Sequence, residues 1–161
     1  MDEEKRDILL RLQKHVNSDV AFKFIRRYSV IDASVHDPQV LGELLDADNS
    51  GDGLWADSAY LSVLIVEVLK LIGFEPHINE RAYRNRPLNE EQKAANRERS
   101  KTRARVEHVF GDLVTSMGGK VVRSIGLARA QTQLGLKNLV YNLKRFVALE
   151  TQSAAASEIA G

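Results

Sequence analysis

Two acidic residues, Asp57 and Glu107, have positions at which a carboxylate could do chemistry. Asp57 directly follows a short apolar segment, 54–56, which we predict as a buried strand. Glu107 lies at the edge of the apolar face of a predicted helix, 96–117, where a side chain can reach a neighbouring element and still meet solvent. Two converging carboxylates repel each other unless a cation lies between them or one is protonated. If the helix packs across the strand end, the pair suits a hard cation such as Mg²⁺ or Mn²⁺.

A simpler interpretation of Glu107 stays open. Arg103 precedes it by four residues, and such a pair on a helix surface is worth roughly 0.2–0.5 kcal/mol. Exposed charge pairs are common, so the spacing alone does not assign chemistry to Glu107. Two aromatic residues, Trp55 and Tyr60, flank Asp57, and we interpret them as core packing rather than base stacking.

The elements that must position these carboxylates follow from the hydrophobic pattern. The helix at 96–117 has apolar residues at the helical period: Val106, Val109, Phe110, Leu113, Val114 and Met117. Upstream we predict a short helix within 2–13, followed by a hairpin of strands 15–20 and 22–33. A helix from Pro38 follows, with Asp37 as its N-cap. After it we predict the strand 54–56, a helix 58–73 closed by Gly73, and a strand 74–78. This order indicates a mixed α/β domain, in which ligands gather at the carboxyl ends of strands.

The C-terminal part is predicted as a short extended segment, 121–125, then a helix, 126–149, and a frayed tail from residue 151. The final helix is expected to place one apolar set inside: Leu136, Leu139, Val140, Leu143 and Val147.

Composition narrows the class of protein. The chain has 161 residues, 43% hydrophobic and 28% charged, which is typical of a globular domain with a real core. It has no cysteine, which excludes disulfides and thiolate metal sites. The N-terminus is acidic and unlike a signal peptide, and the longest apolar run, 61–72, is too short to cross a bilayer. We therefore expect a cytoplasmic protein without a membrane partner.

The charge is unevenly distributed although the net charge is only +1. Segment 32–57 has seven acidic residues and no Lys or Arg, whereas segment 81–105 has nine Lys or Arg and three Glu. A long basic run favours a polyanionic partner, although basic helices can also be solvated surfaces without such a partner.

Several motifs carry a family resemblance. WADSAY at 55–60 and RARVEHVFG at 103–111 resemble the second and third catalytic motifs of bacterial insertion-sequence transposases of the DDE class, most closely the insertion sequence five family. FKFIRRYSVIDASVHDPQVLGELL, MGGKVVRSIGLARA and GLKNLVYNLKRF are similar to that family as well. The resemblance implies a divergent segment at 1–13, a partial catalytic domain at 14–149 and a flexible tail at 150–161. It also implies an incomplete RNase H-like (retroviral-integrase-like) mixed sheet flanked by helices.

The resemblance also implies a function. Members cut DNA at element ends with Mg²⁺ or Mn²⁺ and join the freed 3′ hydroxyl to target DNA. Asp57 matches the second aspartate and Glu107 the glutamate, both catalytic and metal-binding, and Arg103 matches the arginine of the Tyr–Arg–Glu–Lys signature. The residues expected to contact DNA are Arg97, Arg99, Lys101, Arg103, Arg105 and Lys120. Expected partners are the insertion-sequence ends, target DNA, and a second copy or a full-length transposase.

This chain departs from the family pattern at three places. Ser100 and Val114 stand where the signature has tyrosine and lysine. The first catalytic aspartate belongs on a strand upstream of the hairpin, and segment 1–13 does not resemble that strand. Asp7 and Asp19 are poor substitutes. We therefore expect a chain truncated at its N-terminus that is inactive alone and does not necessarily bind the ion. The alternatives are a non-catalytic DNA-binding or inhibitory remnant, and a remnant that does not fold stably.

Overall fold

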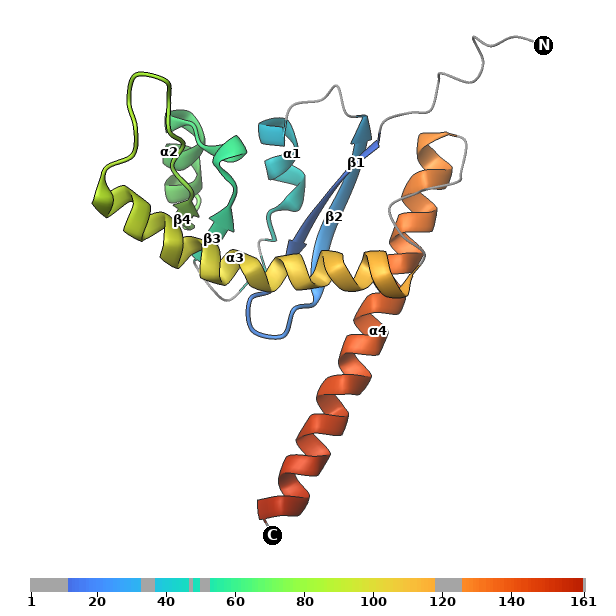
Figure 1. Cartoon of the computed structure of the whole chain (residues 1–161). Helices are drawn as coiled ribbons and strands as arrows, with labels where there is room; N and C mark the ends of the chain where they lie inside the picture. The colour runs from blue at the N-terminus through green and yellow to red at the C-terminus, as the bar shows by residue number, and fades with distance from the viewer. Residues whose placement is uncertain (1–11, 33–36, 47, 50–52, 118–125, 161) are drawn as a thin grey trace, which may run out of the picture.

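The computed structural model describes residues 12–32, 37–46, 48–49, 53–117 and 126–160 (Figure 1). The elements follow in the order β1 (Leu12–Ser18), β2 (Ile25–Asp32), α1 (Asp37–Leu44), β3 (Gly53–Ala56), the 3₁₀ turn η2 (Ser58–Tyr60), α2 (Val63–Leu71), β4 (Glu75–Ile78), α3 (Glu90–Ser116) and α4 (Leu127–Ala160). No helix in these ranges is both long enough and apolar enough to cross a membrane.

The predicted hairpin is confirmed, with shifted ends. β1 and β2 pair antiparallel, with a bulge after Asn17. Phe22 and Phe24, predicted in the second strand, lie in the connecting loop, because the Asp19 carboxylate accepts hydrogen bonds from both of their backbone N–H groups. Leu12 and Gln13, predicted in a helix, belong to β1, and the rest of that predicted helix, 2–11, lies outside the described residues.

The second sheet is the parallel pair β3 and β4, in which Trp55 lies opposite His77. Both strands occur where the hydrophobic pattern predicts them, and Asp57 follows β3 directly. The predicted single mixed sheet is not formed, since the described strands make two separate two-stranded sheets. β1 and β3 do not hydrogen-bond to each other, and both line a common cavity.

The predicted helix 58–73 is split in two. The Asp57 side chain caps the 3₁₀ turn, and the Ser62 side chain caps α2 by accepting a hydrogen bond from the Ile65 N–H at 3.2 Å. Two successive caps start two short helices, which the continuous apolar pattern concealed. Gly73 ends α2 as predicted, with φ of 90°, and Phe74 N–H bonds to the Leu69 carbonyl at 2.9 Å.

Helix α3 begins six residues before the predicted start. Asn89 and Gln92 form a capping box, in which each side chain accepts a hydrogen bond from the other residue's backbone N–H. Val109 and Leu113 on the predicted apolar face are buried, whereas Phe110 and Val114 are each 37% exposed. The apolar face of α3 is therefore narrower than predicted.

Helix α4 differs most from its prediction. It continues to Ala160, through the segment predicted as a frayed tail. The five residues expected inside are all 48–61% exposed, and the buried face instead consists of Ala130, Leu134, Asn138 and Tyr141. Hydrogen bonds explain this orientation, because Tyr141 donates to the Lys23 carbonyl and Asn142 bonds to both backbone groups of Ile25.

Each sheet has its own core. One cluster joins the hairpin to α3 and α4 and contains Ile25, Val109, Leu113 and Tyr141. The other joins α1, α2 and β4 and contains Leu41, Leu69 and Ile78. Helix α3 runs past both sheets (Figure 1), so it lies against β3 and also against α4. This placement brings residues of both sheets to one side of α3.

Candidate active site

Asp57 lies at the carboxyl end of β3, where both of its carboxylate oxygens have partners. Oδ1 accepts a hydrogen bond from the Ser58 backbone N–H, which orients the carboxylate. Oδ2 lies 3.3 Å from Nη2 of Arg103, on α3. The Asp57 side chain is 55% exposed and that of Arg103 only 26%. The carboxylate is therefore open to solvent on one side and held by a guanidinium on the other.

Arg99 and Arg103, one turn apart on α3, lie at the carboxyl ends of the parallel strands, and Glu107 follows one turn later on the same helix. Nη1 of Arg99 donates to the carbonyl of Ile78, the last residue of β4, at 3.0 Å. Arg103 reaches Asp57, directly after β3. Spacing of four residues keeps these side chains on one face of the helix. Arg103 thus contacts Asp57, whereas the sequence had left open an ion pair with Glu107.

The crossing of α3 over the strand ends is fixed by amide contacts upstream of the site. The Asn96 side chain accepts from the Glu80 N–H and donates to the Glu80 carbonyl, both at 2.9 Å. The Asn79 amide donates to the Ser100 hydroxyl at 3.2 Å. A side chain that satisfies both backbone groups of one residue pins the helix to the loop after β4. This contact determines which turn of α3 faces the Asp57 carboxylate.

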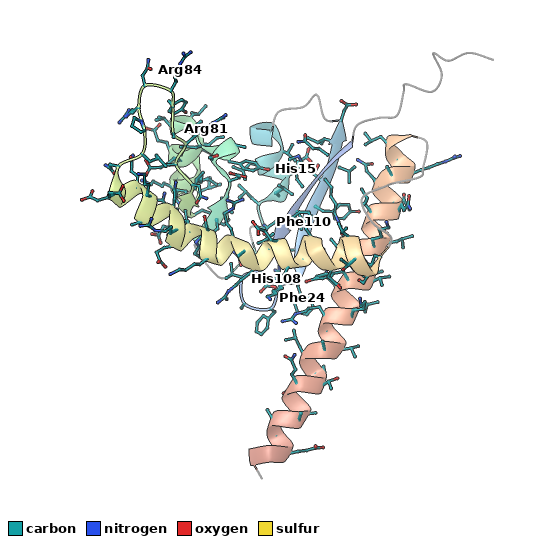
Figure 2. The ribbon with its side chains drawn as sticks, viewed as in Figure 1. His15, Phe24, Arg81, Arg84, His108 and Phe110 are labelled. Carbon is teal, nitrogen blue, oxygen red and sulfur yellow. The ribbon has the colours of Figure 1, made fainter. Side chains whose placement is uncertain are left out.

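Asp57, Arg103 and Glu107 line one cavity of about 240 Å³ between the two sheets. Its walls come from β1, α1, β3 and α3, and many are apolar, including Val16, Leu44, Leu54 and Phe110. His15 and Phe110 mark this region in Figure 2. The structure therefore brings the two predicted carboxylates to one concave surface, although they are far apart along the chain.

The donor set suits a hard cation in part. Mg²⁺ in proteins is often held by one or two carboxylates and keeps several waters. Asp57 and Glu107 offer two carboxylates on one cavity, and Arg103 occupies an Asp57 oxygen that a cation would use. Among the described residues, no group of three or more His, Cys, Asp or Glu side chains could hold a metal. The chemistry of these residues fits one ion completed by water.

The residues predicted to contact DNA have different surroundings. Arg99 is mostly buried, with its guanidinium at the end of β4, and Arg105 donates to the Val20 carbonyl at 3.2 Å. Lys101 pairs with Glu98 at 2.7 Å on the exposed side of α3, where Arg97 is also exposed. Lys120 lies outside the described residues.

A basic loop connects β4 and α3. Arg81, Arg84 and Arg86 are all exposed there, and Figure 2 shows Arg81 and Arg84 on this loop. Tyr83 and Arg86 pair through their backbones and form a tight turn at its tip. The exposed positive charge of the region 81–105 is thus concentrated on this loop and on the outer face of α3.

The structure also reveals contacts that the sequence did not predict. Nδ1 of the buried His15 lies 2.8 Å from the Tyr60 hydroxyl, which connects β1 to the turn after Asp57. Lys14 of β1 lines the same cavity as the carboxylates. No spacing signal marks either residue, because the contact depends on how the two sheets are placed. Trp55 stacks on His77 with ring centroids 4.7 Å apart, and of the two aromatics predicted to pack in the core, Tyr60 packs against the cluster of Leu41, Leu69 and Ile78.

Comparison with known proteins identifies the family. The family model described as "Transposase DDE domain" matches residues 10–143, most of the chain. This chain belongs to the DDE transposase domain family. The DDE domain is also 32% identical over 148 residues to a transposase for insertion sequence element IS1106 from Neisseria meningitidis serogroup B. That alignment covers 92% of this chain and 50% of the relative, so the DDE domain spans half of that protein's length.

The predicted resemblance to insertion-sequence DDE transposases is thereby confirmed, and the narrower insertion sequence five assignment is compatible with it. No solved structure matches this DDE domain. The small sheets and surrounding helices of this chain fit a mixed α/β domain of this family.

Proposed function

We propose that this DDE domain contributes Asp57 and Glu107 to a site for Mg²⁺-dependent, or Mn²⁺-dependent, DNA cleavage and strand transfer at insertion-sequence ends. The observation that carries the proposal is the shared cavity, which Asp57, Glu107 and Arg103 all line, with Arg103 in contact with Asp57. We also propose that this chain belongs to the insertion sequence five family. Residues 14–149 would form an incomplete RNase H-like catalytic domain, and the protein would act in the cytoplasm.

The residues of the chain have distinct roles in this proposal. Asp57 and Glu107 would hold a divalent ion, which when bound would act as a Lewis acid toward the phosphate oxygens at the cleaved bond. The Ser58 N–H keeps the Asp57 carboxylate oriented toward the cavity. Arg103, which can exchange a carboxylate for a phosphate, contacts the DNA backbone next to the ion.

We infer that this chain does not complete transposition by itself. Two-metal catalysis places its ions about 3.5–4 Å apart, which requires carboxylates that bridge them. The described residues supply two carboxylates to the cavity and no group of three metal-binding side chains. A second copy or a full-length transposase would therefore supply the missing ligand.

Metal binding by the purified protein tests the site. Titration with Mn²⁺, followed calorimetrically, is expected to show one weak site that Asp57→Asn and Glu107→Gln both abolish. Glu98→Gln is the matched control, because Glu98 lies on the exposed side of α3 and pairs with Lys101. Unchanged Mn²⁺ binding in both site variants would remove the proposed metal site.

Strand cleavage tests the inferred inactivity. A supercoiled plasmid that carries the element's ends is expected to stay uncut with the chain alone and Mg²⁺. Nicking of that plasmid, abolished by Asp57→Ala, would show that the chain is active without a partner.

A second function is favoured by the basic loop between β4 and α3. Exposed arginines at a tight turn suit phosphate contacts, so the chain is a candidate DNA-binding module that occupies element ends and inhibits a full-length transposase. Affinity for duplex DNA is expected to fall steeply with salt, and Arg84→Gln should reduce the slope of log K against log salt by about 0.9. Salt-insensitive binding would exclude this function.

A further inference from the structure

Lys14 lies on the side of the hairpin that faces α4. Its neighbours His15 and Asn17 point to the other side, where they contact Tyr60 and the Leu44 carbonyl. Side chains alternate along a strand, so Lys14 and Val16 share the opposite face. There, Nζ of Lys14 donates a hydrogen bond to Oδ1 of Asn138 at 2.5 Å. The ammonium is therefore held in place by α4.

A second ammonium adds positive charge at this point. Lys137 directly precedes Asn138 on α4. Burial is the larger cause and repulsion from Lys137 the smaller, and together they lower the pKa of Lys14 to about 8. Within the described ranges, neither ammonium lies within ion-pair distance of a carboxylate. Two neighbouring cations without an anion among the described residues are an unfavourable arrangement, and a bound anion would relieve it.

Asn138 provides a third donor. This residue is 4% exposed, and its Nδ2 has no hydrogen-bond partner among the described residues. Since Nδ2 belongs to the carboxamide that holds Lys14, it lies beside the ammonium. A buried N–H group without an acceptor costs free energy, so an acceptor brought to Lys14 has a donor available.

The position relative to the carboxylates indicates the source of the anion. Lys14 lines the cavity that contains Asp57, Arg103 and Glu107. We propose that Lys14 and Lys137, held by Asn138, form a binding site for a backbone phosphate of the DNA that enters this cavity. The choice of DNA rests on the proposed function, whereas the anion site itself depends only on the two lysines and Asn138.

The Lys14 side chain can be followed directly in the unaltered protein. NMR titration of the lysine side-chain Cε signals, assigned with Lys14→Arg, gives the pKa of Lys14 with no metal present. A bound anion stabilises the ammonium form, so the pKa is expected to rise from about 8 toward the ordinary 10.5 when a short DNA duplex is added. Inorganic phosphate and chloride are compared at equal ionic strength.

Each outcome decides the proposal. A rise in the pKa of Lys14 with duplex DNA supports the proposal, whether or not inorganic phosphate also raises this pKa. A rise with inorganic phosphate only shows a small-anion site and overturns the assignment to DNA. An unchanged pKa with both, or an equal rise with chloride, overturns the site.

Two variants separate this site from the others. Lys137→Gln is expected to reduce the slope of log K against log salt for duplex DNA by about 0.9, the value for one lost phosphate contact. Lys93→Gln is the control, since Lys93 is exposed and already pairs with Glu90. Asp57→Asn should leave the Lys14 titration unchanged. If Mn²⁺ binding is absent while the Lys14 shift persists, the proposed function fails and the anion site stands.

Discussion

The guanidinium of Arg103 occupies one oxygen of Asp57, and a cation that binds there must displace it. The sequence predicted the elements that carry both carboxylates, since Asp57 follows an apolar strand and Glu107 lies on a periodic helix. The sequence did not identify the partner of Arg103. The four-residue spacing along α3 suggests Glu107, and no spacing rule points to Asp57, which belongs to another element. Which of two acids an arginine contacts is decided by packing.

Replacing Arg103 should strengthen metal binding. With Arg103→Gln, a divalent cation no longer competes with a guanidinium at Asp57, and a surface pair worth about 0.2–1 kcal/mol implies an affinity gain of up to about fivefold. Mn²⁺ calorimetry without DNA measures the effect. Arg97→Gln, on the exposed side of the same helix, should leave the affinity unchanged. Weaker binding in Arg103→Gln would show that Arg103 supports the metal site instead of competing with the ion.

At the scale of elements, α3 determines the site because it crosses the ends of both parallel strands. The hydrophobic period predicted this helix but not its start, which depends on the capping box of Asn89 and Gln92. In the same way, the cap at Ser62 divides the predicted helix after β3. Caps depend on a few side-chain hydrogen bonds, so periodicity does not reveal them.

Asn96→Ala should loosen this crossing. The change removes two hydrogen bonds to the Glu80 backbone and leaves part-buried groups without partners, at a cost of about 1–3 kcal/mol. Urea unfolding followed by circular dichroism measures the free energy of unfolding. Arg97→Ala, one residue away and exposed, is the matched control. Equal stability of the two variants would mean that the Glu80 contact does not fix α3.

Asp46 connects β2 to the end of α1 and gives a pH-dependent test. A hydrogen bond from Arg26 at 2.9 Å holds the pKa of Asp46 below its ordinary value, against the opposite effect of burial. A carboxyl whose pKa is lower in the folded state stabilises that state above the unfolded pKa of about 4, and the stabilisation disappears as the pH falls through the folded pKa.

The difference in Tm between the unaltered protein and Asp46→Asn should therefore be largest near pH 7 and shrink below about pH 4. Thermal scans from pH 7 to pH 3 measure it. Glu67→Gln, an exposed change on α2, is expected to show no comparable trend. A Tm difference that is independent of pH would contradict the role of the Asp46 charge.

At the scale of the whole molecule, the sequence predicted the hairpin and the parallel strands but placed the wrong side of α4 inside. Periodicity detects an apolar stripe and cannot say whether it meets the core. The buried face of α4 includes Asn138 and Tyr141, which bond to the hairpin, while the leucine-rich stripe stays exposed. The two separate sheets were missed for a related reason, because strand order depends on contacts that no local pattern encodes.

The exposed stripe of α4 predicts self-association. Replacing Leu143 and Val147 by Gln should shift sedimentation toward the monomer, because exposed apolar side chains at helical spacing favour contact between copies. The Tm should change little, since neither side chain is in the core. Leu134→Gln, on the buried face of the same helix, should instead lower the Tm. A protein that is already monomeric at all concentrations would contradict this prediction.

The separation of the two sheets has a consequence for solvent exchange. In the part of the chain that the structure describes, β1 pairs only with β2 and β3 only with β4. Each of these edge strands leaves the backbone amides on its outer side without a ladder partner. Deuterium uptake along β1 should therefore alternate residue by residue between slow and fast. A polypeptide that added a strand at this edge would slow the fast set, and exchange rates would report its arrival.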